Sequence, residues 1–153
     1  MVLAFDVYRH WETDLRPITL SALRQVSPEQ LHWKPEGWHS SAWDLAVHMA
    51  DCEWHWIYRN ALKKVPWGTK WDPHQFQDLG ELIAFWNGIH RHTLEWLQDS
   101  PVSQLNRKFP MPSIDLPYAT MNWIVYHVME HEIHHRGQVF MLMRMQGVKP
   151  PEV

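Results

Sequence analysis

The amino-acid sequence predicts an all-α protein that folds as a four-helix bundle with long inter-helix connections. Its 153 residues suit a single domain spanning residues 1–153. Short alternating runs of β-branched residues, which are typical of strands, are nearly absent. Long segments with helical periodicity are instead separated by proline-rich connections. Four long helices in one small domain pack most simply as a bundle.

The N-terminal segment predicts one long helix followed by a short one. The long helix covers residues 3–25, and we expect Pro17 within it to kink or split it. Ser27 is the expected N-cap of the short helix, with Pro28 at the first helical position. This helix ends near Trp33, and residues 34–37 (Lys-Pro-Glu-Gly) form a turn.

The middle of the chain predicts two further long helices. The second long helix covers residues 41–62 and is capped by Ser40 or Ser41. The third covers residues 74–98, with Asp72 as its cap. The connections before and after the third helix are both longer than is usual in bundles, so we expect them to cross over the bundle or to wall a pocket at one end.

The C-terminal part predicts an irregular segment and then the fourth helix. Residues 100–117 contain four prolines and are expected to lack regular structure. The last helix covers residues 120–146. Gly147 is expected to stop it, and Pro150 follows.

Composition and charge exclude several classes of protein. The formal net charge of −3 shows no basic excess, so we expect no nucleic-acid partner. No apolar run approaches the roughly 18 residues of a membrane span. Cys52 is the only cysteine and forms no internal disulfide. The first residues do not resemble a secretory signal, and we therefore expect a cytoplasmic protein.

The last predicted helix carries histidines on one face. The residues of this face are Ile124, His127, His131, His135, Gln138 and Leu142, with His134 at its edge. His131 and His135 are one turn apart, so their side chains project to the same side and can converge on one ion. Because Glu132 follows His131, the segment also contains HExxH, in which Glu132 would be the general base of a zinc peptidase.

The second predicted helix carries a narrow polar stripe formed by Asp44, His48, Asp51 and His55. Spacing alone leaves several interpretations open. The stripe is either the solvent-exposed face of the helix or the source of a third metal ligand. Cys52 lies four residues after His48, which allows a His/Cys zinc pair, although a small buried apolar role suits it as well.

Two motifs together resemble the DinB/YfiT-like metalloenzyme family. They are His-Glu-Ile-His-His-Arg-Gly-Gln at residues 131–138 and the upstream segment SSAWDLAVHMADCEW at residues 40–54. The resemblance covers nearly the whole chain and includes the closing Gly147 to Pro150. It implies a four-helix bundle, often dimeric, with a metal held by His48, His131 and His135. His127, His134 and His55 would then lie outside the ligand set.

Three neutral imidazoles would leave the ion's charge uncompensated and a coordination position open, which suits catalysis better than a structural role. Zinc is the first choice, although nickel, iron, manganese or cobalt also accept imidazole. The resemblance implies a metal-dependent transferase that uses a small thiol, such as bacillithiol or mycothiol, on a small-molecule substrate. The alternatives are a metal-binding stress or sensor module without turnover, a metal-dependent hydrolase, and a structural bundle. The charged candidates for orienting the thiol are Asp44, Asp51, Glu132 and Arg136.

The last helix is apolar on a second face as well, at Val125, Met129, Ile133, Phe140 and Met143. A helix that is apolar on two sides needs a second partner, so we expect a homodimer with this face in or near the interface. Six tryptophans at helical spacing are expected in the core or the dimer contacts: Trp43, Trp54, Trp56, Trp86, Trp96 and Trp123.

Overall fold

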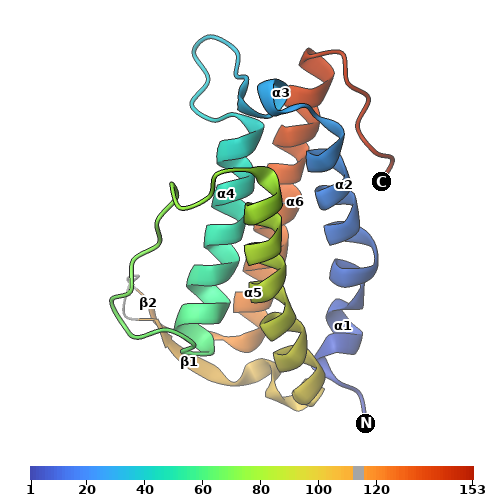
Figure 1. Cartoon of the computed structure of the whole chain (residues 1–153). Helices are drawn as coiled ribbons and strands as arrows, with labels where there is room; N and C mark the ends of the chain where they lie inside the picture. Colours follow the sequence, from blue (N-terminus) through green and yellow to red (C-terminus); the bar gives the residue numbers. More distant parts are fainter. Residues whose placement is uncertain (112–115) are drawn as a thin grey trace.

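The computed structural model describes residues 1–111 and 116–153, which form four long helical rods and a small hairpin at one end (Figure 1). The all-α bundle is therefore confirmed. The first and last rods run in one direction and the middle two in the other. Because the two middle rods are parallel, the connection between them returns along the length of the bundle (Figure 1).

The first rod is continuous from Ala4 to Gln25 but changes its hydrogen bonding near the proline. It consists of α1 (Ala4–His10), the π-helical η1 (Trp11–Leu15) and α2 (Arg16–Gln25). Pro17 lies in the first turn of α2, where its missing N–H costs little. The wider π turn before it accommodates the proline, so the rod is not split. The short α3 (Pro28–His32) begins at Ser27 as predicted, because Ser27 and Gln30 cap each other reciprocally.

The second rod comprises α4 (Ala42–Glu53) and the π-helical η2 (Trp54–Ala61). Ser41 is its N-cap. Its hydroxyl accepts a bond from the Asp44 amide at 3.2 Å, and the Asp44 carboxylate accepts one from the Ser41 amide at 2.8 Å. This reciprocal pair explains why the helix starts after Ser41 and not after Ser40.

The predicted start of the third helix was wrong. The helix α5 (Leu79–Asp99) is capped by Asp78, whose carboxylate accepts a bond from the Glu81 amide at 2.9 Å. The carboxylate of Asp72, the predicted cap, accepts instead from the His74 amide at 2.9 Å and closes a local turn. Aspartate is common both in turns and at helix caps, and at Asp72 the side-chain hydrogen bond forms a turn.

The segment predicted to be irregular contains a 3₁₀ turn, η3 (Val102–Asn106), and an antiparallel hairpin of β1 (Lys108–Met111) and β2 (Leu116–Thr120). Both strands are edges of a two-stranded ribbon, where proline is tolerated, and their prolines therefore hid the strand signal. Phe109 pairs with Ala119, and both side chains are buried against the bundle. Pro112 lies outside the described residues.

The last rod is α6 (Met121–Met145), capped by the Thr120 hydroxyl and stopped at Gly147, whose φ of +74° is the left-handed conformation typical of a helix end. Within the part of the chain that is described, no helix combines the length and the apolar character that crossing a membrane requires.

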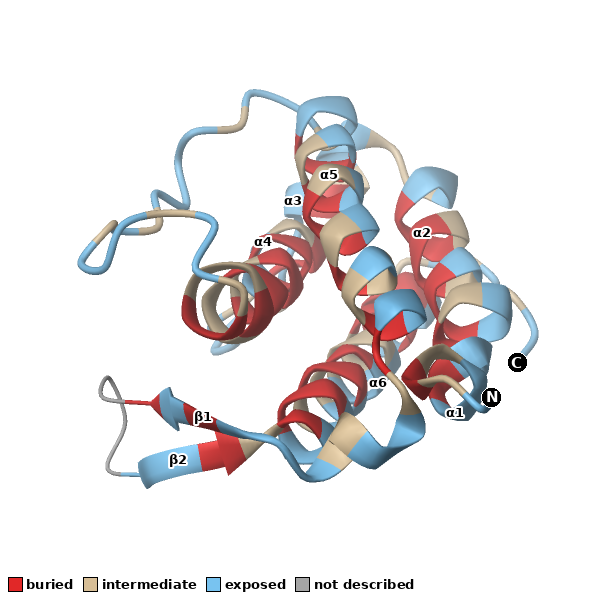
Figure 2. Ribbon diagram, turned by 90° about the horizontal axis from the view of Figure 1, so that it is seen from below, coloured by how far each residue is buried: buried red, intermediate tan, exposed pale blue. Residues whose placement is uncertain are grey.

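The rods turn their buried faces toward one another (Figure 2). This arrangement corrects the prediction for α6. Val125, Met129, Phe140 and Met143 are buried inside the chain's own core, and Ile133 alone of that predicted face is exposed. The helix is apolar on two sides because α2 and α4 both pack against it. Among the six tryptophans, Trp54 and Trp86 are buried, Trp43, Trp56 and Trp96 are half-buried, and Trp123 is exposed.

A buried polar network links three rods in the middle of the bundle. The fully buried carboxylate of Glu53 accepts hydrogen bonds of 2.7 Å each from Trp86 Nε1, His90 Nδ1 and Thr93 Oγ1. The Arg16 guanidinium lies 3.8 Å from the same carboxylate. Burial alone would raise the pKa of Glu53, but His90, Arg16 and Thr93 lower it to about 2. The network therefore holds an ionised carboxylate between α2, α4 and α5.

Candidate metal centre

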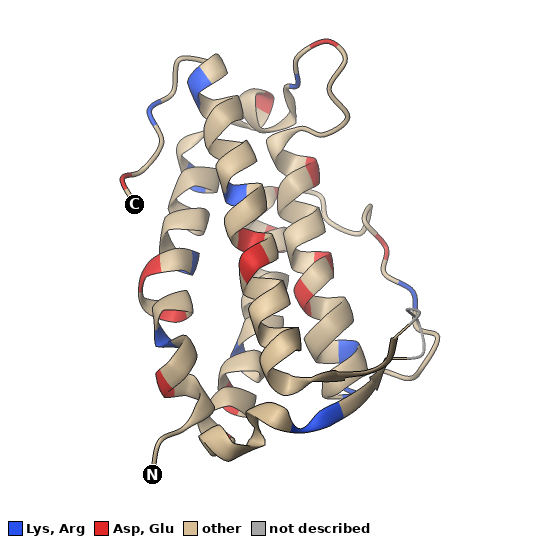
Figure 3. Ribbon diagram, turned by 180° about the vertical axis from the view of Figure 1, so that it is seen from behind, with Lys and Arg blue, Asp and Glu red and all other residues tan. Residues whose placement is uncertain are grey.

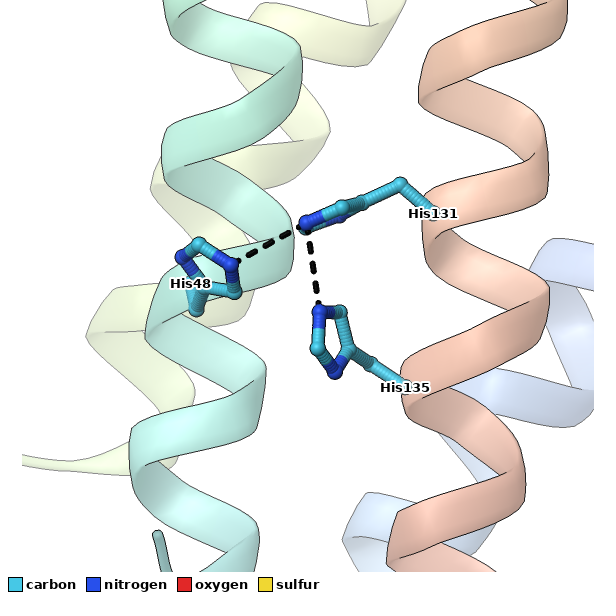
Figure 4. Close-up of side chains that lie close together, drawn as sticks. All are labelled: His48, His131 and His135. Carbon is cyan, nitrogen blue, oxygen red and sulfur yellow. Dashed lines mark hydrogen bonds between the residues drawn. The ribbon is translucent and has the colours of Figure 1, made fainter. Parts of the chain in front are cut away.

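Three histidines from two rods converge at the contact between α4 and α6 (Figure 4). The Nε2 atom of His131 lies 3.0 Å from Nε2 of His48 and 3.2 Å from Nε2 of His135. Among the described residues, this is the one group of histidine, cysteine or acidic side chains with ligand atoms close enough to hold a metal ion.

Helix geometry and helix packing each contribute to this arrangement. His131 and His135 lie on successive turns of one helix, so their rings leave α6 on the same side. His48 comes from α4, which packs along α6 and brings together residues that are 83 positions apart. Figure 4 shows the three imidazoles in the space between the two helices, with their ring nitrogens turned toward one another.

Burial favours the neutral imidazole at His131 and His135. Burial, together with the neighbouring histidines, lowers the pKa of His131 to about 3. Burial also lowers the pKa of His135. The second ring nitrogen of His135, Nδ1, donates a 2.6 Å hydrogen bond to the Gln138 side-chain oxygen, so Nε2 is the atom left with a free lone pair. A ring nitrogen with a free lone pair is the form of histidine that binds a metal ion.

The spacing of the nitrogens fits a divalent ion. Bonds of about 2.05 Å in a tetrahedral arrangement separate the ligand nitrogens by about 3.3 Å. The observed separations of 3.0 and 3.2 Å are close to this value. Three neutral nitrogen donors also match the preference of zinc and its neighbours for imidazole.

The other histidines of the two helices lie outside the cluster. His127 is stacked on the Trp123 ring, with 4.9 Å between the ring centroids and 5° between the planes. His134 is exposed, and its ring touches only the edge of His135. His55 accepts a 2.5 Å hydrogen bond from the Arg59 guanidinium.

Two alternatives from the sequence do not match the structure. Cys52 is buried in the apolar core, its pKa is raised by burial, and it does not belong to the histidine cluster, so a His/Cys zinc pair is wrong. Glu132 is fully buried inside the bundle, where its carboxylate accepts a 2.7 Å bond from Trp11 Nε1. The glutamate of the HExxH pattern is thus directed into the core, because adjacent helix positions point about 100° apart.

The other charged candidates for orienting the thiol also differ in whether they can reach a ligand. Arg136 directs its guanidinium to the Leu15 carbonyl oxygen on the first rod, at 3.5 Å. Asp44 is occupied in the cap of α4. Asp51 is half-buried one turn after His48, and its Oδ1 atom has no hydrogen-bond partner among the described residues. Burial raises the pKa of Asp51, whereas His48 and Arg59 oppose that rise. Asp51 is the charged group best placed to meet a ligand.

The described residues line two cavities that share His48. The larger, about 490 Å³, lies under the segment before α4 and includes His135 and Gln138 together with Trp38. The smaller, about 290 Å³, lies under the connection before α5 and includes Asp44, Asp51 and His74. The long connections therefore cross the bundle and also wall cavities. The sequence did not indicate Trp38 or His74, because nothing local specifies where a loop folds back, whereas Gln138 was visible three residues after His135.

The comparisons with known proteins agree with this architecture. The family model described as "DinB family" matches residues 1–153. A DinB-like protein from Bacillus subtilis has a TM-score of 0.66 and 24% identity over 90% of this chain and 91% of its own. A DinB-like protein from Bacillus cereus has a TM-score of 0.70 and 17% identity over 95% and 94%. At such identities the solved structures show the fold. No curated protein matches the chain.

Proposed function

Because the chain belongs to the DinB family, we propose that it binds a divalent metal ion through His48, His131 and His135. We further propose that it uses the ion to transfer a small thiol to an electrophilic substrate. The observation that carries the proposal is the convergence of three Nε2 atoms within 3.0–3.2 Å contacts beside an open cavity. Zinc is the first candidate, followed by nickel, iron, manganese and cobalt.

The bound ion would supply a Lewis acid that lowers the pKa of a thiol or of water. The chain's own residues contribute orientation. Gln138 holds His135 in the tautomer that leaves Nε2 free. The cavity of about 490 Å³ is large enough for a small molecule and lies against both His48 and His135. In the transfer, a carbon–sulfur bond forms on the acceptor, the acceptor's leaving group departs and the thiol proton passes to solvent.

Within the larger cavity, the position of the carboxylates favours thiol transfer over hydrolysis, whereas Asp51 in the smaller cavity keeps hydrolysis as the alternative. A hydrolase needs a base beside the attacking water. Glu132 lies inside the core, and no aspartate or glutamate is among the described residues that line the larger cavity. We also propose a cytoplasmic location, because small thiols are kept reduced there. A metal-binding module without turnover would use the same three histidines, so only an activity measurement distinguishes that hypothesis from the enzyme.

The metal site is tested with protein purified without a histidine tag. Zn²⁺ titration by calorimetry should give one site per chain. His48→Ala should weaken binding at least about 100-fold, because each ligand of a zinc site contributes about 3 kcal/mol. His134→Ala is the matched control, since His134 adjoins His135 but lies outside the cluster. Equal affinity of the parent protein and His48→Ala contradicts the assignment.

Turnover is tested with a panel of small thiols and electrophilic acceptors, followed by the loss of free thiol. Metal-loaded parent protein should consume thiol, and His48→Ala should not. Metal binding without any turnover across the panel would favour the stress or sensor module. Release of product without thiol consumption would favour the hydrolase.

We also propose a homodimer that uses the solvent-exposed face of α6. Trp123, Tyr126, Ile133 and Met141 are 40–51% exposed and follow one another at helical spacing on this face. This face replaces the buried one predicted from sequence. Sedimentation at tens of micromolar tests the proposal, and a monomer at such a concentration contradicts it.

A further inference from the structure

A third cavity lies at the far end of the rod that carries His48. Its volume is about 590 Å³, within the range of small-molecule sites, and η2 and the segment that follows it form most of its wall. Arg59 lies 11 residues after His48, which corresponds to about 16 Å along a helix. The cavity is therefore separate from the histidine cluster.

Positive charge is concentrated in this cavity. Arg59, Lys63 and Lys64 line it, although the chain as a whole carries a net charge of −3. Among the described residues, no aspartate or glutamate lines the cavity, and none of the three cations forms an ion pair with a carboxylate. Figure 3 shows basic residues toward the hairpin end of this rod, whereas its acidic residues lie higher along α4.

The guanidinium of Arg59 is held in place by neutral groups. Its nitrogens donate to the side-chain oxygen of Asn60 at 3.1 Å, to the Thr69 carbonyl oxygen at 3.1 Å and to His55. Three of its five N–H donors are used in this way, and two remain. Burial lowers the pKa of Arg59 and Asp51 raises it, so the side chain stays charged. A fixed, charged donor pair suits the oxygens of a phosphate or carboxylate.

Trp67 adds a flat apolar wall to the same cavity. Its side chain is 62% exposed, and its ring lies 5.4 Å from the Arg59 guanidinium carbon. The Trp54 ring also lies 5.4 Å from the same guanidinium carbon. An exposed indole beside a fixed cation offers stacking to a planar group that carries negative charge.

We propose that this cavity binds a small organic anion, with a phosphate or carboxylate at Arg59, Lys63 and Lys64 and a planar apolar group against Trp67. The site does not depend on the metal, and it goes beyond the proposed transferase function. Its occupant is thus either a regulatory ligand or the distant end of a molecule bound elsewhere. The recognition chemistry is the same in both cases.

The proposal is tested by titrating ¹⁵N-labelled protein with phenyl phosphate, and separately with inorganic phosphate, while following amide signals. Phenyl phosphate should bind with a Kd on the order of 1 mM or tighter and shift the amides of Lys63, Lys64, Val65 and Trp67. Inorganic phosphate should bind at least about fivefold more weakly, because it lacks the stacked ring. Binding should weaken as salt is added.

Three variants locate the site. Lys64→Gln and Trp67→Ala should each weaken phenyl phosphate binding about fivefold. Lys70→Gln, on the same connection but outside the cavity lining, is the matched control and should leave it unchanged. His48→Ala should also leave it unchanged, which separates this site from phosphate bound at a metal.

Three outcomes would overturn the proposal. The first is the absence of saturable binding to the parent protein. The second is equal weakening by Lys64→Gln and Lys70→Gln, which would indicate diffuse attraction to surface charge. The third is loss of binding in His48→Ala, which would place the anion at the metal centre instead. Failure of the thiol reaction has no bearing on any of these results.

Discussion

Replacing Glu53 by glutamine should destabilise the bundle by about 3 kcal/mol at neutral pH. The fall of its pKa from 4.5 to about 2 corresponds to about that much free energy, because one pKa unit is worth about 1.4 kcal/mol. Breaking a buried ion pair on one side typically costs a similar amount. For a chain of this length, the loss should lower Tm by about 6–12 °C.

The pH dependence follows from the direction of each pKa. Glu53 has a lowered pKa, so its contribution is complete above pH 4.5 and is lost as pH falls through about 2. Burial alone would lower the pKa of His90, but Glu53 and Glu12 raise it. The contribution of His90 is therefore complete below pH 6.5 and is lost as pH rises through its raised pKa. The Tm difference between the parent and Glu53→Gln should be largest between about pH 4.5 and 6.5.

A second buried glutamate provides the matched control. Burial raises the pKa of Glu132, with Arg16 and Trp11 opposing the rise, and one of its oxygens has no hydrogen-bond partner among the described residues. The folded state therefore favours its neutral form, and stability linked to Glu132 falls as pH rises above 4.5. Glu132→Gln should be neutral or stabilising at pH 7.

The Tm of both variants and of the parent is measured by circular dichroism from pH 3 to 8. This range covers roughly the ordinary pKa values of glutamate and histidine. A Glu53→Gln protein that melts within about 2 °C of the parent at neutral pH would refute the reasoning, because Glu53 would then contribute less than about 1 kcal/mol. A Glu132→Gln protein that loses as much stability as Glu53→Gln would equally refute it.

The remaining predictions concern the metal centre and the assembly. Gln138→Leu should weaken Zn²⁺ affinity about 10–100-fold in calorimetry, and Gln138→Glu should retain it, because a carboxylate also accepts the bond from His135. Ile133→Asp should shift the proposed dimer toward monomer in sedimentation and leave Tm nearly unchanged, since Ile133 is exposed. Met129→Asp should instead unfold the chain, because Met129 is 6% exposed within the core, and a folded monomeric Met129→Asp protein would contradict this packing.

Local chemistry made several parts of the structure predictable. Ser27 was identified as a cap, and Ser41 as one of two candidates with Ser40, because a cap depends on a side chain and a backbone amide only three residues apart. The convergence of His131 and His135 followed from one helical turn. Asp72 shows the limit of such reasoning. An aspartate in a turn and an aspartate at a helix cap both accept a hydrogen bond from an amide two or three residues ahead, so the sequence does not distinguish them.

The packing of the rods decided what helical spacing left open. Helical spacing alone also allowed the stripe with His48 to be a solvent-exposed face, and the family resemblance was the reason to count His48 as a ligand. In the structure, the packing of α4 against α6 brings His48 to His131. Glu132 stood in a peptidase-like pattern, yet the rotation of α6 buries it against Trp11. The apolar face of Met129 suggested a second subunit, and the chain's own rods cover it. The amino-acid sequence determines which side chains share a helix face. Only the tertiary structure determines which residues contact that face, because contacts between residues distant in sequence depend on how the whole core packs.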